Sequence, residues 1–159
     1  MVPGHAPPAT APRDHEFVAL CAACRSLGGV ARAEELARRL ADGGAPPSGV
    51  DDHRPQAAAA CDGDLRLARL ILGGELFSFG WQHQVWVPMF QLQPQELAVR
   101  PAVRQVTAEL VADFDGWSLA EWYLAPNSWL GARRPVDLLD DALPAVLEAA
   151  RADRFMAVC

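Results

Sequence analysis

The sequence predicts a mainly α-helical protein that contains one small β-hairpin. Apolar residues recur at intervals of three and four through most of the chain, which is the spacing of a helix with one buried face. Residues 75–87 are instead rich in aromatic and β-branched residues, which favours two short strands. Glycine pairs close the first three helical segments, and these pairs are Gly28-Gly29, Gly43-Gly44 and Gly73-Gly74.

The composition is that of a globular chain with a core of its own. Hydrophobic residues make up 51% of the 159 residues, which suits one domain or two small ones. The formal net charge of −6 argues against a chain that binds nucleic acid over its whole surface, but it allows a local basic face. The N-terminus lacks the apolar run of a signal peptide, and no stretch reaches the ~20 apolar residues of a membrane span. We therefore expect a cytoplasmic protein that does not enter a membrane.

Residues 1–13 are rich in proline and alanine, so we expect a disordered lead-in. A first helix is predicted to start at Asp14, whose carboxylate suits an N-cap. Cys21 and Cys24 lie on the apolar face of this helix. Because one Cys-x-x-Cys pair without a second pair is weak evidence for zinc, we interpret both thiols as small core residues.

Two more helices are predicted before the hairpin, over residues 31–41 and residues 65–72. Asp64 is the expected N-cap of the second of these. Residues 45–62 between them contain three prolines and break the helical periodicity. We therefore expect a mobile loop there, in which the alanine run can form a helical turn.

The hairpin is predicted to turn near residues 82–84, and Pro88 places its second strand at a sheet edge. After a connector, apolar residues at helical spacing predict one helix over residues 101–114 and another over residues 143–154. Between these two helices lies the segment 117–139, which holds three of the five tryptophans and the only tyrosine.

The segment 117–139 is predicted to form a helix, an exposed hinge and a second short helix. Pro126 disfavours helical backbone in the residue before it and so ends the first helix. Pro135 suits the first turn of the next helix, because its missing N–H would be unpaired there anyway. Arg133 and Arg134 are expected to project from the hinge.

This segment resembles the toxin-binding domain of Xre/MbcA/ParS-type antitoxins. The resemblance rests on the run W-x-L-A-x-W-x3-P-N-x2-L-G-x-R-x-P-x-D-L-L, with W-V-P-M-F-Q-L upstream, and covers roughly residues 84–152. The chain departs from the family pattern at Ala132, where relatives usually have a second glycine, and at Leu92, where they usually have an aromatic residue. The resemblance implies a partner, a cognate toxin of the RES-domain type that consumes NAD.

Carried over by position, the resemblance assigns toxin binding to six residues, which are Asn127, Trp129, Arg133, Arg134, Pro135 and Asp137. It also implies that the apolar tail, residues 155–159, can plug the entrance of the toxin's active site. The residues themselves leave two interpretations of Trp129 open. It is either a binding anchor beside two arginines, because interface hot spots favour tryptophan and arginine, or a core residue.

The order of elements over residues 14–92 resembles a degenerate helix-turn-helix module with a small β-hairpin wing. Residues 93–159 would then form a helical toxin-binding domain. In a DNA-binding version the recognition helix would start at Asp64, although Asp62 and Asp64 would repel phosphates. An operator-binding transcriptional autoregulator is therefore the alternative function, and a module kept for packing or dimerisation is the other possibility. The candidate DNA-binding residues are Arg54, Arg66 and Arg69.

We recognise no active-site motif in the sequence, such as a nucleophile elbow, a phosphate loop or a metal-spaced set of cysteines and histidines. We therefore expect no enzymatic activity, no cofactor and no bound metal. The expected partners are a cognate toxin and a second copy of the chain in a homodimer, with operator DNA for the alternative function. A dimeric adaptor whose toxin is lost or different is a third interpretation.

Overall fold

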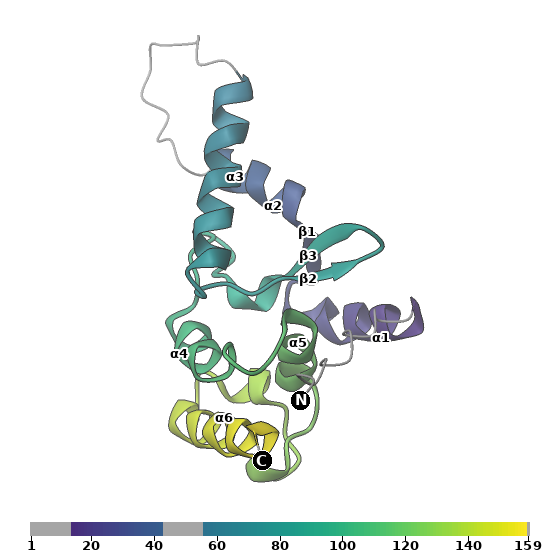
Figure 1. Cartoon of the computed structure of the whole chain (residues 1–159), viewed down its shortest axis with the longest axis vertical. Helices are drawn as coiled ribbons and strands as arrows, with labels where there is room; N and C mark the ends of the chain where they lie inside the picture. The colour runs from purple at the N-terminus through teal and green to yellow at the C-terminus, as the bar shows by residue number, and fades with distance from the viewer. Residues whose placement is uncertain (1–13, 43–55, 159) are drawn as a thin grey trace, which may run out of the picture.

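The structure, a computed structural model, describes residues 14–42 and 56–158. Its first elements are α1 (Asp14–Cys24), the 3-10 helix η1 (Arg25–Leu27), β1 (Val30–Arg32), α2 (Ala33–Asp42), α3 (Gln56–Leu72), β2 (Phe79–Trp81), β3 (Gln84–Pro88) and the 3-10 helix η2 (Met89–Gln91). The remaining elements are α4 (Pro101–Leu110), α5 (Gly116–Leu124), the 3-10 helices η3 (Ser128–Leu130) and η4 (Pro135–Leu138), and α6 (Leu143–Val158). Figure 1 shows α3 at one end of the molecule, α6 at the other, and the small sheet between them. None of the helices in the described ranges is long and apolar enough to cross a membrane.

A three-stranded antiparallel sheet with the strand order β1-β3-β2 lies at the centre of the fold. In β3, Trp86 pairs with Phe79 of β2, and the next residue, Val87, pairs with Ala31 of β1. Because side chains alternate along a strand, Trp86 and Val87 point to opposite faces of the sheet. The two faces are covered by different helices.

One face of the sheet carries aromatic side chains and packs against α1 and α5. Phe17 of α1 stacks on Trp81, with ring centroids 3.7 Å apart, and meets Trp86 edge-on at 5.0 Å. Phe79 meets Trp117 of α5 edge-on at 5.1 Å. The opposite face joins α2 and α3 in a smaller cluster, formed by Leu36, Ala37, Leu40, Leu67, Leu76, Val87 and Leu92.

The C-terminal helices are tied to the sheet through Tyr123 of α5, which is fully buried. Its hydroxyl lies 2.9 Å from Oγ1 of Thr107 and donates to the carbonyl of Val103 at 3.1 Å, so the buried phenol has partners on α4. The ring stacks on Phe77, from the segment before β2, with centroids 5.8 Å apart. One core cluster therefore contains residues from α1, the sheet and all three C-terminal helices.

Gln91, in the stretch W-V-P-M-F-Q-L, is a buried polar residue with a full set of partners. Its Oε1 accepts from the backbone N–H of Phe77 at 2.9 Å, and its Nε2 donates to the carbonyls of Phe77 at 2.9 Å and Pro88 at 3.1 Å. The amide therefore bridges the end of β3 to the strand-like segment before β2 without leaving a buried polar group unpaired.

Two glycines allow close approaches that a larger residue would prevent. Gly63 lies inside α3, where a Cβ would collide with the backbone carbonyl of Ala37 in α2. Gly116 opens α5, where a Cβ would collide with the carbonyl of Ser78 just before β2. Glycine is required at both positions, because the neighbouring elements pack too closely to leave room for a Cβ.

The fold class predicted from the sequence is wrong in its N-terminal part. A two-stranded wing with its second strand at an edge was expected, but β1 adds a third strand that pairs along Pro88 and makes β3 the central strand. In addition, α1 lies on the opposite face of the sheet from α2 and α3. The three N-terminal helices therefore do not pack together as one helical cluster. The cause lies at Gly28 and Gly29, with φ of 95° and 78°, which turn the chain out of α1 so that Val30 enters a strand along β3. The structure is a mostly helical chain with a small sheet.

Several boundaries also differ from expectation, since α4 ends at Leu110 rather than at residue 114 and α6 continues to Val158 rather than ending at residue 154. α3 begins at Gln56, so residues 56–62, expected in the loop, are helical, as the strong helix propensity of alanine favours. The helix predicted after Pro135 is a single 3-10 turn, η4. Residues 1–13 and 43–55 lie outside the described residues. The division of the chain at residues 92 and 93 stays a prediction.

Candidate interaction site

The hinge begins where Pro126 ends α5, and its backbone closes into a compact loop. Asn127 is the N-cap of η3, since its Oδ1 accepts from the backbone N–H of Trp129 at 2.9 Å. The backbone N–H of Asn127 donates to the carbonyl of Arg133 at 3.0 Å, and its carbonyl accepts from Ala132 at 3.0 Å. The loop from Asn127 to Arg133 is therefore fixed by its own backbone and does not depend on a partner for its shape.

The turn inside this loop uses two consecutive left-handed residues. Gly131 has φ of 64° and Ala132 has φ of 62°. Ala132 thus occupies a position where glycine is the unstrained residue. The chain keeps the turn with alanine, at the cost of local backbone strain.

Asp153 of α6 holds the hinge and α5 together. Its Oδ2 accepts from Nδ2 of Asn127 at 2.6 Å and from Nε1 of Trp122 at 2.8 Å, and its Oδ1 accepts from Nε1 of Trp129 at 3.0 Å. Three N–H groups, one from α5 and two from the hinge, therefore meet at one carboxylate, which is a charged and hence strong acceptor. We did not identify Asp153 from the sequence. The available signal was an acid in the last turns of a helix, where the helix dipole disfavours one.

Trp129 is exposed, with 61% of its surface accessible, while the next residue, Leu130, is buried. The core interpretation of Trp129 is therefore wrong. The Asp153 carboxylate holds the polar edge of the indole, so its apolar surface is presented to solvent in a defined orientation. Large exposed aromatic surfaces of this kind are common in interaction sites.

The two arginines of the hinge differ in their surroundings. Arg134 is bound by Asp137 through two contacts, Nε to Oδ2 at 2.6 Å and Nη2 to Oδ1 at 2.7 Å. The hydrogen bonds that Arg134 donates to the Asp137 carboxylate raise the pKa of Arg134 above its ordinary value. Arg133 is exposed and has no ion pair or side-chain hydrogen bond within the described part of the chain. Of the two, Arg133 is the one available to a partner.

The six predicted toxin-binding residues thus divide into two groups. Asn127 and Pro135 are buried and support the loop from inside. Trp129, Arg133 and Asp137 are exposed, and Arg134 is half-buried beside Asp137. The hinge brings all six into one compact segment, but only the second group can contact another protein.

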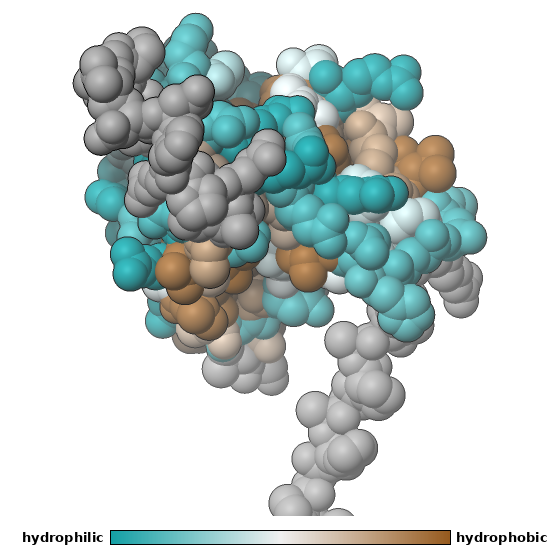
Figure 2. Space-filling model, turned by 90° about the horizontal axis from the view of Figure 1, so that it is seen from above, coloured by the Kyte–Doolittle hydropathy of each residue, from teal (hydrophilic) through white to brown (hydrophobic). Residues whose placement is uncertain are grey.

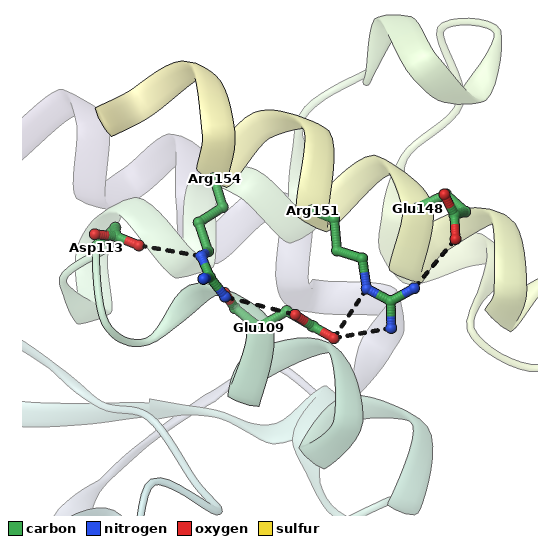
Figure 3. Close-up of polar contacts among 5 residues, drawn as sticks. All are labelled: Glu109, Asp113, Glu148, Arg151 and Arg154. Carbon is green, nitrogen blue, oxygen red and sulfur yellow. Dashed lines mark hydrogen bonds and ion pairs between the residues drawn. The ribbon is translucent and has the colours of Figure 1, made fainter. Parts of the chain in front are cut away.

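Ion pairs fasten α6, which carries Asp153, to α4 (Figure 3). Arg151 donates to Oε1 of Glu109 at 3.0 and 3.1 Å and pairs with Glu148 at 3.1 Å. Arg154 lies 3.6 Å from a carboxylate oxygen of Glu109 and 3.5 Å from one of Asp113. This network orients the end of α6, where Phe155 and Met156 are 70% and 67% exposed. The exposed apolar surface at this end of the molecule therefore includes Phe155 and Met156 of the predicted tail as well as Trp129.

Two of the three predicted DNA-binding residues, Arg66 and Arg69, lie three positions apart on α3 and are exposed. Arg54 lies outside the described residues. Nη1 of Arg66 donates to the carbonyl of Leu40 at 3.4 Å, and Arg69 is exposed. Figure 2, a view from above, shows a face on which hydrophilic side chains predominate and hydrophobic ones form separate areas. Operator binding remains an untested prediction, but the fold it relied on is not the one observed.

The cysteines of α1 behave as core residues. Cys24 is fully buried and Cys21 partly buried. Burial raises the pKa of the Cys24 thiol to about 12 and also raises that of Cys21, so both are protonated at neutral pH and poor metal ligands. Within residues 14–42 and 56–158, no group of three histidine, cysteine or acidic side chains could hold a metal ion.

Comparison with known proteins gave no match to the chain from protein-family models, curated proteins or solved structures.

Proposed function

We propose that the chain is an antitoxin-like interaction module whose hinge binds and neutralises a cognate protein toxin. The observation that carries the proposal is Trp129, a large exposed indole in a loop of fixed shape, with its N–H already bonded to Asp153. Burying this indole against a partner would gain apolar contact without leaving its donor unpaired. Such an aromatic anchor is typical of the residues that dominate binding energy.

Arg133 supplies the charge of the proposed interface. Because it has no ion pair within the described residues, a partner's carboxylate can pair with it without first breaking an existing contact. Arg134 would have to leave Asp137, so we expect it to contribute less. The buried pair Asn127 and Pro135 contributes only by holding the loop.

The nature of the partner comes from the resemblance to Xre/MbcA/ParS-type antitoxins. A RES-domain toxin that consumes NAD is the partner we propose, with both proteins in the cytoplasm. Phe155 and Met156, exposed at the end of α6, are placed to extend the contact beyond the hinge.

The test is neutralisation in cells. A RES-domain protein from the same genome is expressed with the wild-type chain, with Trp129→Ala and with Arg133→Ala, and growth and cellular NAD are measured. We expect the wild type to restore both, Trp129→Ala to restore neither, and Arg133→Ala to act in between. Val18→Ala, which removes an exposed apolar side chain from α1, is the matched control and should behave as wild type. Equal protection by all four chains would show that the hinge is not part of the interface. Protection by none of them would show that the toxin is not the partner.

A further inference from the structure

The outer face of α3 carries an apolar stripe that the packing of the fold leaves exposed. Four residues spaced by four, three and four positions form it, and these are Cys61, Leu65, Ala68 and Leu72. Leu65 is 52% exposed and Leu72 is 88% exposed. Leu67, Leu70 and Ile71 point the other way, toward α2 and the sheet. The spacing is that of the a and d positions of a coiled coil, where two helices pack along a narrow seam.

From this stripe we infer that α3 is a self-association surface whose partner is α3 of a second copy, packed antiparallel. In that arrangement Leu65 of one copy lies against Ala68 of the other, and Cys61 lies against Leu72. Each layer then pairs one leucine with one small residue, so all layers have similar width and pack evenly. A parallel pair would set leucine against leucine and small against small, which leaves layers of unequal width.

The charges beside the stripe are complementary to themselves in the same arrangement. Asp62 and Arg69 are both exposed and stand seven residues apart on one flank, and neither has an ion pair among the described residues. When the two helices run in opposite directions, Asp62 of each copy lies across from Arg69 of the other. The two reciprocal pairs are what an interface with two-fold symmetry requires, since the same patch must complement itself. This charge pattern identifies a second copy as the occupant.

The interface is small. Only four apolar side chains of each copy take part, so the buried area falls below the ~1,200 Å² at which stable interfaces begin. The dimer is therefore weak and in exchange with the monomer, and it does not depend on the toxin. It uses a different surface from the hinge, so each site can be tested with the other intact.

The first test is cross-linking through the stripe. In the antiparallel pair the two copies of Cys61 lie at opposite ends, so oxidation of the wild type with diamide should not link Cys61 of one copy to Cys61 of the other. Leu72→Cys places a new thiol across from Cys61 and should give a linked dimer, and adding Cys61→Ser should abolish the link. A linked dimer in the wild type through Cys61, or no link in Leu72→Cys, would overturn the antiparallel pairing.

The second test is sedimentation velocity over a wide range of concentration. We expect the average mass of the wild type to rise with concentration, and Leu65→Lys to remain monomeric. Val18→Lys, at an exposed apolar residue of α1, is the matched control and should associate as the wild type does. Because Leu65 and Val18 are both exposed, circular dichroism should show an unchanged fold in both variants. A monomeric wild type at every concentration would show that α3 is not covered by a second copy.

Discussion

Replacing Asp153 with alanine removes the acceptor shared by Trp122, Asn127 and Trp129. Trp122 and Asn127 are 9% and 8% exposed, so their N–H groups lose a partner in a place where water has little access. An unsatisfied buried donor costs about 1–3 kcal/mol. Trp129 is exposed and can donate to water instead, so the loss of its hydrogen bond to Asp153 adds little. Since Asp153 is itself only partly buried, some water can enter, and we expect a loss of about 2–4 kcal/mol in the free energy of unfolding.

The assay is urea denaturation, followed by tryptophan fluorescence and by circular dichroism. Asp153→Asn keeps one oxygen, which can accept from Trp122 and Asn127 while its amide faces the exposed Trp129, so we expect a smaller loss of about 1 kcal/mol. Asp141→Ala, at an exposed acid in the turn before α6, is the control and should change stability by less than about 0.5 kcal/mol. If Asp153→Ala were no more destabilising than Asp141→Ala, the carboxylate would not hold the hinge.

Three further predictions concern backbone and burial. Gly116→Ala should lower stability by about 1–3 kcal/mol in urea, because its Cβ would collide with the Ser78 carbonyl, and an unchanged midpoint would contradict this contact. Ala132→Gly should change stability by no more than about 0.5 kcal/mol, because relief of the positive φ offsets the added freedom of the unfolded chain, whereas Ala132→Val should lower the thermal midpoint. The Cys24 thiol has an ordinary pKa of 9.0 when unfolded and about 12 when folded, so the unfolded state releases the proton first and stability should fall as pH rises from about 9 to about 12. Cys24→Ala should lack that part of the pH dependence. If the urea midpoint changed with pH in the same way in both proteins, burial of the Cys24 thiol would not contribute to the pH dependence.

The helices of the C-terminal part follow from local signals in the sequence. Asp115 is the N-cap of α5, since its Oδ1 accepts from the backbone N–H of Ser118 at 2.7 Å, and aspartate is a preferred residue at that position. Pro126 ends that helix and Pro135 opens η4. These features depend on residues within one turn of each other, so the sequence is sufficient to predict them.

β1 depended on a contact that no local signal reveals. The strand is three residues long and exists because β3, more than fifty positions later, offers a free edge to Val30. Without that edge, the residues before α2 are indistinguishable from the start of a helix. Because β1 was not predicted, the placement of α1 on the opposite face of the sheet from α2 and α3 could not be predicted either.

The hinge shows the same limit at the candidate site. Its turn residues were predictable, since Gly131 and the residues around it carry turn chemistry. The sequence could not predict whether Trp129 lies in the core or at the surface. Its position is set by Asp153, which lies 24 positions away on another helix. The position of Asp153 near the end of a helix marks it as unusual, but the sequence around it does not show which distant donors it accepts from.

The measurement that tests the account most directly is calorimetric titration of the purified RES-type partner with the wild-type chain and with Trp129→Ala. We expect stoichiometric binding by the wild type and at least a tenfold weaker affinity for Trp129→Ala, which is about 1.4 kcal/mol for one lost anchor. Circular dichroism should confirm that Trp129→Ala keeps the fold. Equal affinity of the two chains would contradict the claim that the exposed indole of the hinge is the binding anchor.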